Sequence, residues 1–309
     1  SCSRHAGGVV IGEQLDKFMP LISSKGVRQT PWSEGQNVRQ LEPMGFIKFD
    51  ILGLSTLRMI EDCITKILQR HHGIENPTFD QIKKFYDDTL HPDVLNLDDQ
   101  EVYENIFHNG KWIGIFQFTE KGMQRLAKSA NIRSIIDISA ITSIYRPGPL
   151  SAGVDRSYIE AKEDPYHIEY ANDTVRSVTE ETYGFLIFQE QIALLAHKLG
   201  KNLSLDEGNL LRKILTKKGT GKGHEVKEKI YNKFIEGCMD RFMSKESADG
   251  LWRTFEYFSG YGFNKSHAVS YSIISYQCAW LCHYYTTEWV AAFLDKEPER
   301  SEEHTSELQ

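Results

Sequence analysis

Among the side chains of this sequence, an aspartate inside a short apolar run is the strongest candidate for a chemical role. Asp50 stands among Phe, Ile and Leu in residues 46–54, FIKFDILGL. A carboxylate in apolar surroundings is costly unless a hydrogen-bond donor or a metal ion compensates it. Two interpretations follow: Asp50 ends a strand and caps the helix expected from Ser55, or it binds a metal. The spacing alone favours the helix cap.

Basic side chains form a second candidate site in residues 198–233. This segment holds ten Lys and Arg against four Asp and Glu, whereas the whole chain carries a formal net charge of −7. A cationic surface on an anionic chain concentrates a polyanion at one place. Within it, residues 216–223 read TKKGTGKG, a composition suited to contacts with phosphates. The alternative is a solvated helix face with ordinary pairs, such as Glu225 with Lys229.

Two further segments place cations at helix boundaries. Residues 145–149, YRPGP, end a helix at a rigid corner that carries Arg146. Residues 259–267, SGYGFNKSH, join a glycine-rich turn to a helix N-terminus, with Lys265 and His267 on either side of Ser266. Backbone N–H groups, the helix dipole and a cation together predict a phosphate site there. Residues 188–191, FQEQ, are better explained as the cap of a helix start.

The elements that position these residues follow from length and composition. The chain has 309 residues, 40% hydrophobic and 26% charged, enough for one large core or two ordinary ones. No run of about 18 apolar residues is present, which predicts a cytoplasmic protein without membrane spans. Five cysteines without a CxxC pair argue against a disulfide framework or a zinc site.

Hydrophobic periodicity predicts an α+β chain with a small mixed segment followed by a long helical one. Strands are expected at residues 7–11 and 46–52, with proline-punctuated loops between them. After Gly53 the apolar residues recur at every third or fourth position, and Ser204 with Glu207 forms a capping box. Helices are expected around residues 57–68, 99–108, 120–129, 134–145, 189–199, 204–215, 225–243, 247–258 and 266–285.

Seven motifs in register along residues 4–267 carry a family resemblance. They are RHAGGVVI at 4–11, KFDILGLSTL at 48–57, GIFQF with GM at 114–123, RPGP at 146–149, TYG with QEQ at 182–191, LRK with KK at 211–218, and GYGFNKSH at 260–267. The series resembles the alpha subunits of bacterial DNA polymerase III, which are family C replicative DNA polymerases.

The resemblance implies a nucleotidyltransferase in which three aspartates hold two Mg²⁺ ions. Residues 1–55 would be the C-terminal part of a polymerase-β-like palm and residues 56–299 a mainly α-helical fingers domain. Asp50 matches the third aspartate, a catalytic metal ligand, and Lys48 matches a lysine near the reacting phosphates. Two such ions activate the primer 3′ hydroxyl and stabilise the leaving pyrophosphate. The other two aspartates of the family precede the segment that begins at His5, so this chain alone is expected to be inactive.

The resemblance also implies roles for the cations of the fingers and for partners. The residues expected to contact nucleotide or DNA phosphates are Arg146, Arg212, Lys213, Lys217, Lys218, Lys265, Ser266 and His267. Primer–template DNA and deoxynucleoside triphosphates are the implied substrates. In the full-length family, a sliding clamp, a clamp loader and a proofreading subunit are the implied partners.

Two other functions are also compatible with parts of the sequence. The main alternative is a non-catalytic nucleic-acid-binding module derived from the fingers. A magnesium-dependent nucleotidyltransferase with another substrate is disfavoured by the fingers motifs.

The last ten residues do not look like natural sequence. Residues 300–309, RSEEHTSELQ, match the in-frame translation of a common sequencing adapter at every position. We therefore expect the natural sequence to stop near Glu299.

Overall fold

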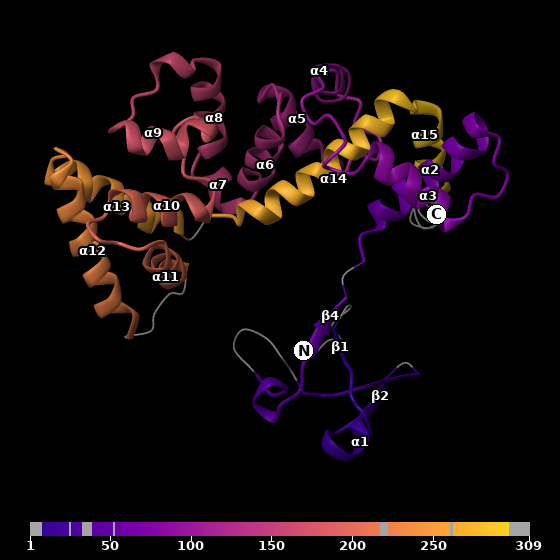
Figure 1. The fold of residues 1–309 in the computed structure, drawn as a ribbon, viewed down its shortest axis with the longest axis horizontal. Coiled ribbons are helices and arrows are strands. Elements are labelled where there is room, and N and C mark those ends of the chain that lie inside the picture. Colours follow the sequence, from indigo (N-terminus) through magenta and orange to yellow (C-terminus); the bar gives the residue numbers. More distant parts are fainter. Residues whose placement is uncertain are drawn as a thin grey trace, which may run out of the picture. The chain divides into compact units, whose positions relative to one another are not determined.

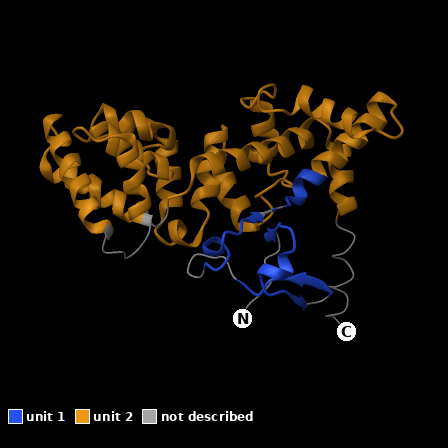
Figure 2. Ribbon diagram, turned by 60° about the horizontal axis from the view of Figure 1, so that its bottom comes forward, with its two compact units in different colours: residues 1–58 blue, residues 59–309 orange. Residues whose placement is uncertain are grey.

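The computed structural model describes residues 8–24, 26–32, 39–51, 53–216, 222–259 and 262–296. The chain divides into unit 1, residues 1–58, and unit 2, residues 59–309 (Figure 2). Residues 300–309, expected to be an adapter translation, lie outside the described residues. Within the described part, no helix combines the length and the apolar character needed to cross a membrane.

Unit 1 contains two small antiparallel sheets. Strand β1 (Gly8–Val10) pairs with β4 (Lys48–Asp50), so that Gly8 lies opposite Asp50. This confirms the two expected strands, although both are shorter than predicted. The expectation of loops between them was wrong, because this stretch also forms α1 (Leu15–Phe18), the hairpin of β2 (Ile22–Ser24) and β3 (Val27–Gln29), and the 3₁₀ turn η1 (Glu42–Met44). Gly26 adopts a positive φ of 76° in the hairpin turn, which glycine tolerates without strain.

Unit 2 is helical, and the periodicity located most of its long helices (Figure 1). The additional elements α3, α7, α8, α9 and α15 were not predicted. Their bounds and those of the predicted elements are α2 (Ser55–His72, beginning in unit 1), α3 (Phe79–Thr89), α4 (Gln100–Val102), the π-helical turn η2 (Tyr103–His108), α5 (Lys121–Ser129), α6 (Ile135–Ile144), α7 (Pro147–Ser151), α8 (Val154–Glu163), η3 (Pro165–His167), α9 (Asp173–Thr179), η4 (Glu180–Thr182), α10 (Gln189–Leu199), α11 (Leu205–Thr216), α12 (Lys222–Asp240), α13 (Lys245–Ser259), α14 (Lys265–Tyr284) and α15 (Thr286–Lys296).

The first core of unit 2 forms around α14, which runs beside α6 (Figure 1). Small and polar residues on these helices allow close approach and pair with one another. Ser139 donates to Ser272 across the interface at 2.9 Å, and both side chains are buried. Gln277 donates to the carbonyl oxygen of Leu90 at 2.8 Å. These bonds satisfy polar groups that would otherwise destabilise the core.

The second core is built from α9 to α13, with Phe234, Trp252 and Phe255 packed at its centre. Two glycines determine how closely its helices approach. A Cβ atom on Gly208 of α11 would lie 2.5 Å from the carbonyl oxygen of Ala193. A Cβ atom on Gly237 of α12 would lie 2.2 Å from the carbonyl oxygen of Leu199. Helices α10, α11 and α12 therefore touch backbone to backbone.

We predict that Gly237→Ala lowers the free energy of unfolding by about 3 kcal/mol, because the added methyl group must push two backbones apart. Gly250 of α13 is the matched control, since a Cβ atom there meets nothing within 4 Å. Gly250→Ala should raise the free energy of unfolding by about 0.5 kcal/mol through reduced entropy of the unfolded chain. Urea denaturation measures both. Equal stability of the two variants would contradict the close packing of α12.

Candidate functional site

Several residues expected to contact phosphates meet where α10 and α14 begin. The two helix starts are joined by a parallel bridge between Phe188 and Phe263. The amide of Gln189 donates to the carbonyl of Phe263 at 2.9 Å, and the amide of Phe263 donates to that of Ile187 at 3.1 Å. The side chain of Gln189 adds a bond to the carbonyl of Gly262 at 3.0 Å. These bonds bring segments that are far apart in sequence into one site.

Glu190 holds the N-terminus of α14 through both of its carboxylate oxygens. Its Oε1 accepts from Asn264 Nδ2 at 2.7 Å, and its Oε2 accepts from the amide of Lys265 at 2.8 Å. The Oδ1 of Asn264 in turn accepts from the amide of His267 at 2.8 Å and from the hydroxyl of Ser266 at 2.7 Å. The helix end was predicted to offer these amides to a phosphate, whereas the amides of Lys265 and His267 already have acceptors within the chain.

The sequence interpretation of residues 188–191 as a helix cap was correct for one side chain. Gln191 is buried, and its Oε1 accepts from the amides of Ile187 and Phe188 at 2.9 and 3.0 Å. Its Nε2 donates to the carbonyl of Val178 at 3.1 Å. The contact of Glu190 with α14 was missed, because a partner so distant along the chain leaves no local signal.

The cations at this site are paired with acids. Lys265 Nζ lies 2.6 and 2.8 Å from the two carboxylate oxygens of Glu181. Arg212 Nη1 lies 3.4 Å from Glu190 Oε1 and 3.5 Å from Gln189 Oε1. Lys213, Ser266 and His267 are exposed. Lys265 and Arg212 are therefore each paired with a carboxylate, and an incoming anion would compete with these carboxylates for the same two cations.

Arg146 reaches the site from the start of α7. Its Nε donates to the carbonyl of Ser143 at 2.7 Å, and its guanidinium lies over the ring of Phe263 at 4.8 Å. Partial burial lowers the pKa of Arg146 from its ordinary value. The row of rings continues through His267, 5.5 Å from Phe263, to Tyr271, 4.2 Å from His267. Arg146 and His267 thus both lie against the ring of Phe263.

A pocket of about 550 Å³ lies on the other side of Arg146. Its lining residues are Gln117, Thr119, Glu120, Met123, Thr142, Tyr145, Arg146, Pro147 and Leu150. Gln117 has a positive φ of 67°, and its buried Oε1 has no hydrogen-bond partner among the described residues. Gln117 belongs to the GIFQF motif of residues 114–118 but was not predicted as a site residue. The pocket has a mixed polar and apolar lining and the volume of an ordinary small-ligand site.

Acids outside residues 198–233 offset part of the positive excess predicted there. Lys201 pairs with Glu236 at 2.5 Å and with Asp240 at 3.2 Å, and Lys227 pairs with Glu256 at 2.6 Å. Lys233 pairs at 2.6 Å with Glu207, an acid within the segment. The predicted phosphate contacts Lys217 and Lys218 lie outside the described residues. Counting charges along the sequence overestimated the basic character of this surface.

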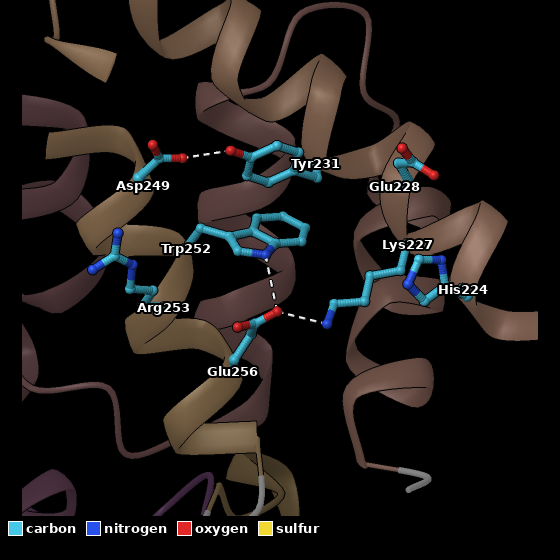
Figure 3. A pocket seen from close by; sticks show the side chains of 8 residues that line it. All are labelled: His224, Lys227, Glu228, Tyr231, Asp249, Trp252, Arg253 and Glu256. Carbon is cyan, nitrogen blue, oxygen red and sulfur yellow. Dashed lines mark hydrogen bonds and ion pairs between the residues drawn. The ribbon is translucent and has the colours of Figure 1, made fainter. Parts of the chain in front are cut away.

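A second pocket, of about 370 Å³, lies between α12 and α13 in the same region (Figure 3). Five of its eight lining residues bond to one another. Glu256 accepts from Trp252 Nε1 at 3.2 Å and pairs with Lys227 at 2.6 Å. Tyr231 donates to Asp249 at 2.5 Å. This pocket mixes both signs of charge and does not have the composition of a phosphate site.

The candidate metal residue lies in unit 1. Lys48 and Asp50 are two positions apart on β4. The structure describes the backbone of Asp50 but not its side chain. Among the residues described, no group of three or more His, Cys, Asp or Glu could hold a metal ion. The described residues thus do not by themselves fit a two-ion site.

Comparisons with known proteins give one consistent result. Residues 56–239 match the family model of the bacterial DNA polymerase III alpha subunit finger domain. The chain is similar to the DNA polymerase III subunit alpha of Xylella fastidiosa, at 33% identity over 306 residues, which is 98% of this chain and 24% of that protein. Proteins of the same name from Campylobacter jejuni and Aquifex aeolicus are each 34% identical, over 95% and 96% of this chain and 23% of their own length. The chain spans about a quarter of the length of these relatives.

We predict a pH-dependent contribution of Glu207 to stability. Hydrogen bonds from the Lys233 ammonium and from the Ser204 amide lower the pKa of this carboxyl. A carboxyl with a lowered pKa in the folded state stabilises the fold above its unfolded pKa of about 4.3, and the contribution is lost as the pH falls through the folded pKa. Glu207→Gln should therefore be destabilised relative to the wild type at pH 7, and the difference should shrink as the pH falls to 3. Urea denaturation at both values tests this, and a constant difference would contradict it.

Proposed function

Because this chain belongs to the family of bacterial DNA polymerase III alpha subunits, we propose that it supplies the fingers of a DNA-directed DNA polymerase that extends a primer with deoxynucleotides. The observation that carries the proposal is the family match over residues 56–239. The full-length protein would act in the cytoplasm with a sliding clamp, a clamp loader and a proofreading subunit. Only the family resemblance supports these partners.

The cations at the starts of α7 and α14 and on α11 would contact phosphates of the incoming nucleotide or of DNA. The proposed contacts are Arg146, Arg212, Lys213, Lys217, Lys218, Lys265, Ser266 and His267. Support comes from the position of Arg146 over Phe263 and of Lys265 and Arg212 beside Glu181 and Glu190. Cations that the fold already holds in place lower the cost of orienting a triphosphate. A phosphate would take the place of Glu181 on Lys265.

We propose that residues 1–55 belong to the palm and that Asp50 is one ligand of a magnesium ion, with Lys48 near the reacting phosphates. Ile47, Phe49 and Ile51 alternate along β4 and its flanks, and they are 68%, 46% and 65% exposed. An apolar face of this kind normally packs against further structure. This supports a place for β1 and β4 in a larger layer. The remaining ligands of the ions would come from residues outside the described part.

We predict that a polypeptide of residues 1–309 binds primer–template DNA but does not extend the primer. Binding should weaken steeply with salt, with a slope of log affinity on log salt of roughly −0.9 for each phosphate neutralised. Fluorescence anisotropy measures the binding, and a gel assay with Mg²⁺ and deoxynucleotides measures the extension. Absence of DNA binding would refute the proposal. Robust extension of the primer would refute the need for further metal ligands. Binding without extension agrees both with this proposal and with the alternative of a non-catalytic nucleic-acid-binding module.

We predict that Lys217→Glu with Lys218→Glu lowers the affinity for DNA by about tenfold or more and makes the salt slope shallower by roughly two phosphates. The control is Lys83→Glu with Lys84→Glu on α3, which reverses the same charge at two exposed positions. That control should lose much less affinity if DNA lies along α11 and α14. Equal losses for both pairs would show that only net charge matters and would remove residues 217–218 from the interface.

A further inference from the structure

The contacts of Glu190 suggest a task beyond the neutralisation of nearby cations. We infer that Glu190 is a positioning residue that fixes the start of α14, and with it Lys265 and His267, for phosphate binding. The inference rests on the proposed function, because it needs those two residues to contact phosphates. Glu190 itself touches no reacting group in this scheme.

The direction of each hydrogen bond explains why a carboxylate is required. Glu190 accepts two short hydrogen bonds, from Asn264 Nδ2 and from the amide of Lys265, in addition to the longer contact from Arg212 Nη1 at 3.4 Å. Asn264 can donate toward Glu190 only while its Oδ1 faces the amide of His267. A glutamine at position 190 offers one acceptor and one donor group, so one of the two contacts becomes donor against donor. Turning the Asn264 amide over relieves that clash but removes the cap of α14.

The series of hydrogen bonds from Glu190 through Asn264 to His267 therefore ties the first turn of α14 to the position of α10. Glu190 is in the first turn of α10, whose buried residues belong mainly to the second core. Residue Ala268, one turn into α14, belongs to the first core. The carboxylate thus sets how two separately packed helices meet. A group that served only as a counter-ion would not need these directional bonds to backbone and amide.

Glu181 offers a matched comparison at the same helix end. Among the described residues, its carboxylate bonds only to the flexible ammonium of Lys265, at 2.6 and 2.8 Å, and its side chain is 35% exposed, against 32% for Glu190. Replacing either residue with glutamine removes one negative charge at similar exposure. Charge alone would make both substitutions favour DNA, since each leaves the site more positive. Positioning by Glu190 predicts opposite signs for the two.

The experiment measures primer–template affinity of the 309-residue chain by fluorescence anisotropy over a salt series. Glu181→Gln should bind about two- to fivefold more tightly than the wild type, the range of one exposed ion pair. Glu190→Gln should bind about tenfold more weakly, the size expected for the loss of a hydrogen bond to a charged group. Glu190→Asp keeps both acceptors and the charge, so it should stay within about threefold of the wild type.

A second variant keeps the test decisive if Glu190→Gln folds poorly. Asn264→Ala breaks the same chain of bonds without changing any charge, and it should also weaken DNA binding by about tenfold. Amide hydrogen exchange provides a local readout. Exchange at residues 265–268 should accelerate in Glu190→Gln and Asn264→Ala but not in Glu181→Gln.

The outcomes separate this inference from the proposed function. If the wild type does not bind DNA, the proposed function fails. If the wild type binds and Glu190→Gln binds as tightly or more tightly, Glu190 is only a counter-ion and the inference is overturned while the function stands. Unchanged affinity of Asn264→Ala would overturn it as well.

Discussion

Two backbone hydrogen bonds between residues 187–189 and Phe263 connect the two cores of unit 2. Phe188 packs in the core around α14, whereas Ile192, one turn later on α10, packs in the core of α9 to α13. Buried Gln191 holds the amides just before α10, so the chain cannot shift there without leaving polar groups unpaired. The relative placement of Arg212 and Lys265, which belong to different helices, depends on this short contact.

Electrostatic balance is the second constraint on the site. A cluster of Arg and Lys around one helix end repels itself unless anions are present. Glu181 and Glu190 supply those anions within the chain, at low cost because each remains partly exposed. At the proposed phosphate site, ligand binding would exchange one anion for another on the same cations.

Sequence reasoning succeeded where the signal is local and failed where it is not. The capping box of Ser204 and Glu207 is present as expected, and apolar periodicity located most long helices. Helix α3 was missed although Thr78 and Gln81 form the same kind of box. The partners of Lys201 and Glu190 depend on chain folding, so neither the ion pairs of the basic segment nor the contact of Glu190 with α14 could be predicted from spacing. The proposed roles of Asp50 and Arg146 rest mainly on the family resemblance, because spacing alone favoured a helix cap for Asp50.

The glycine contacts of the second core have a mechanical consequence. At Gly208 and Gly237 the backbones of α10, α11 and α12 lie against one another with no side chain between them. Just after α10, the backbone amide of Lys201 donates to the carbonyl oxygen of Lys233 at 2.9 Å. Sliding one helix past another would break that bond and drive backbone atoms together. The three helices therefore form one rigid block, so the position of α10 also fixes the position of Arg212 on α11.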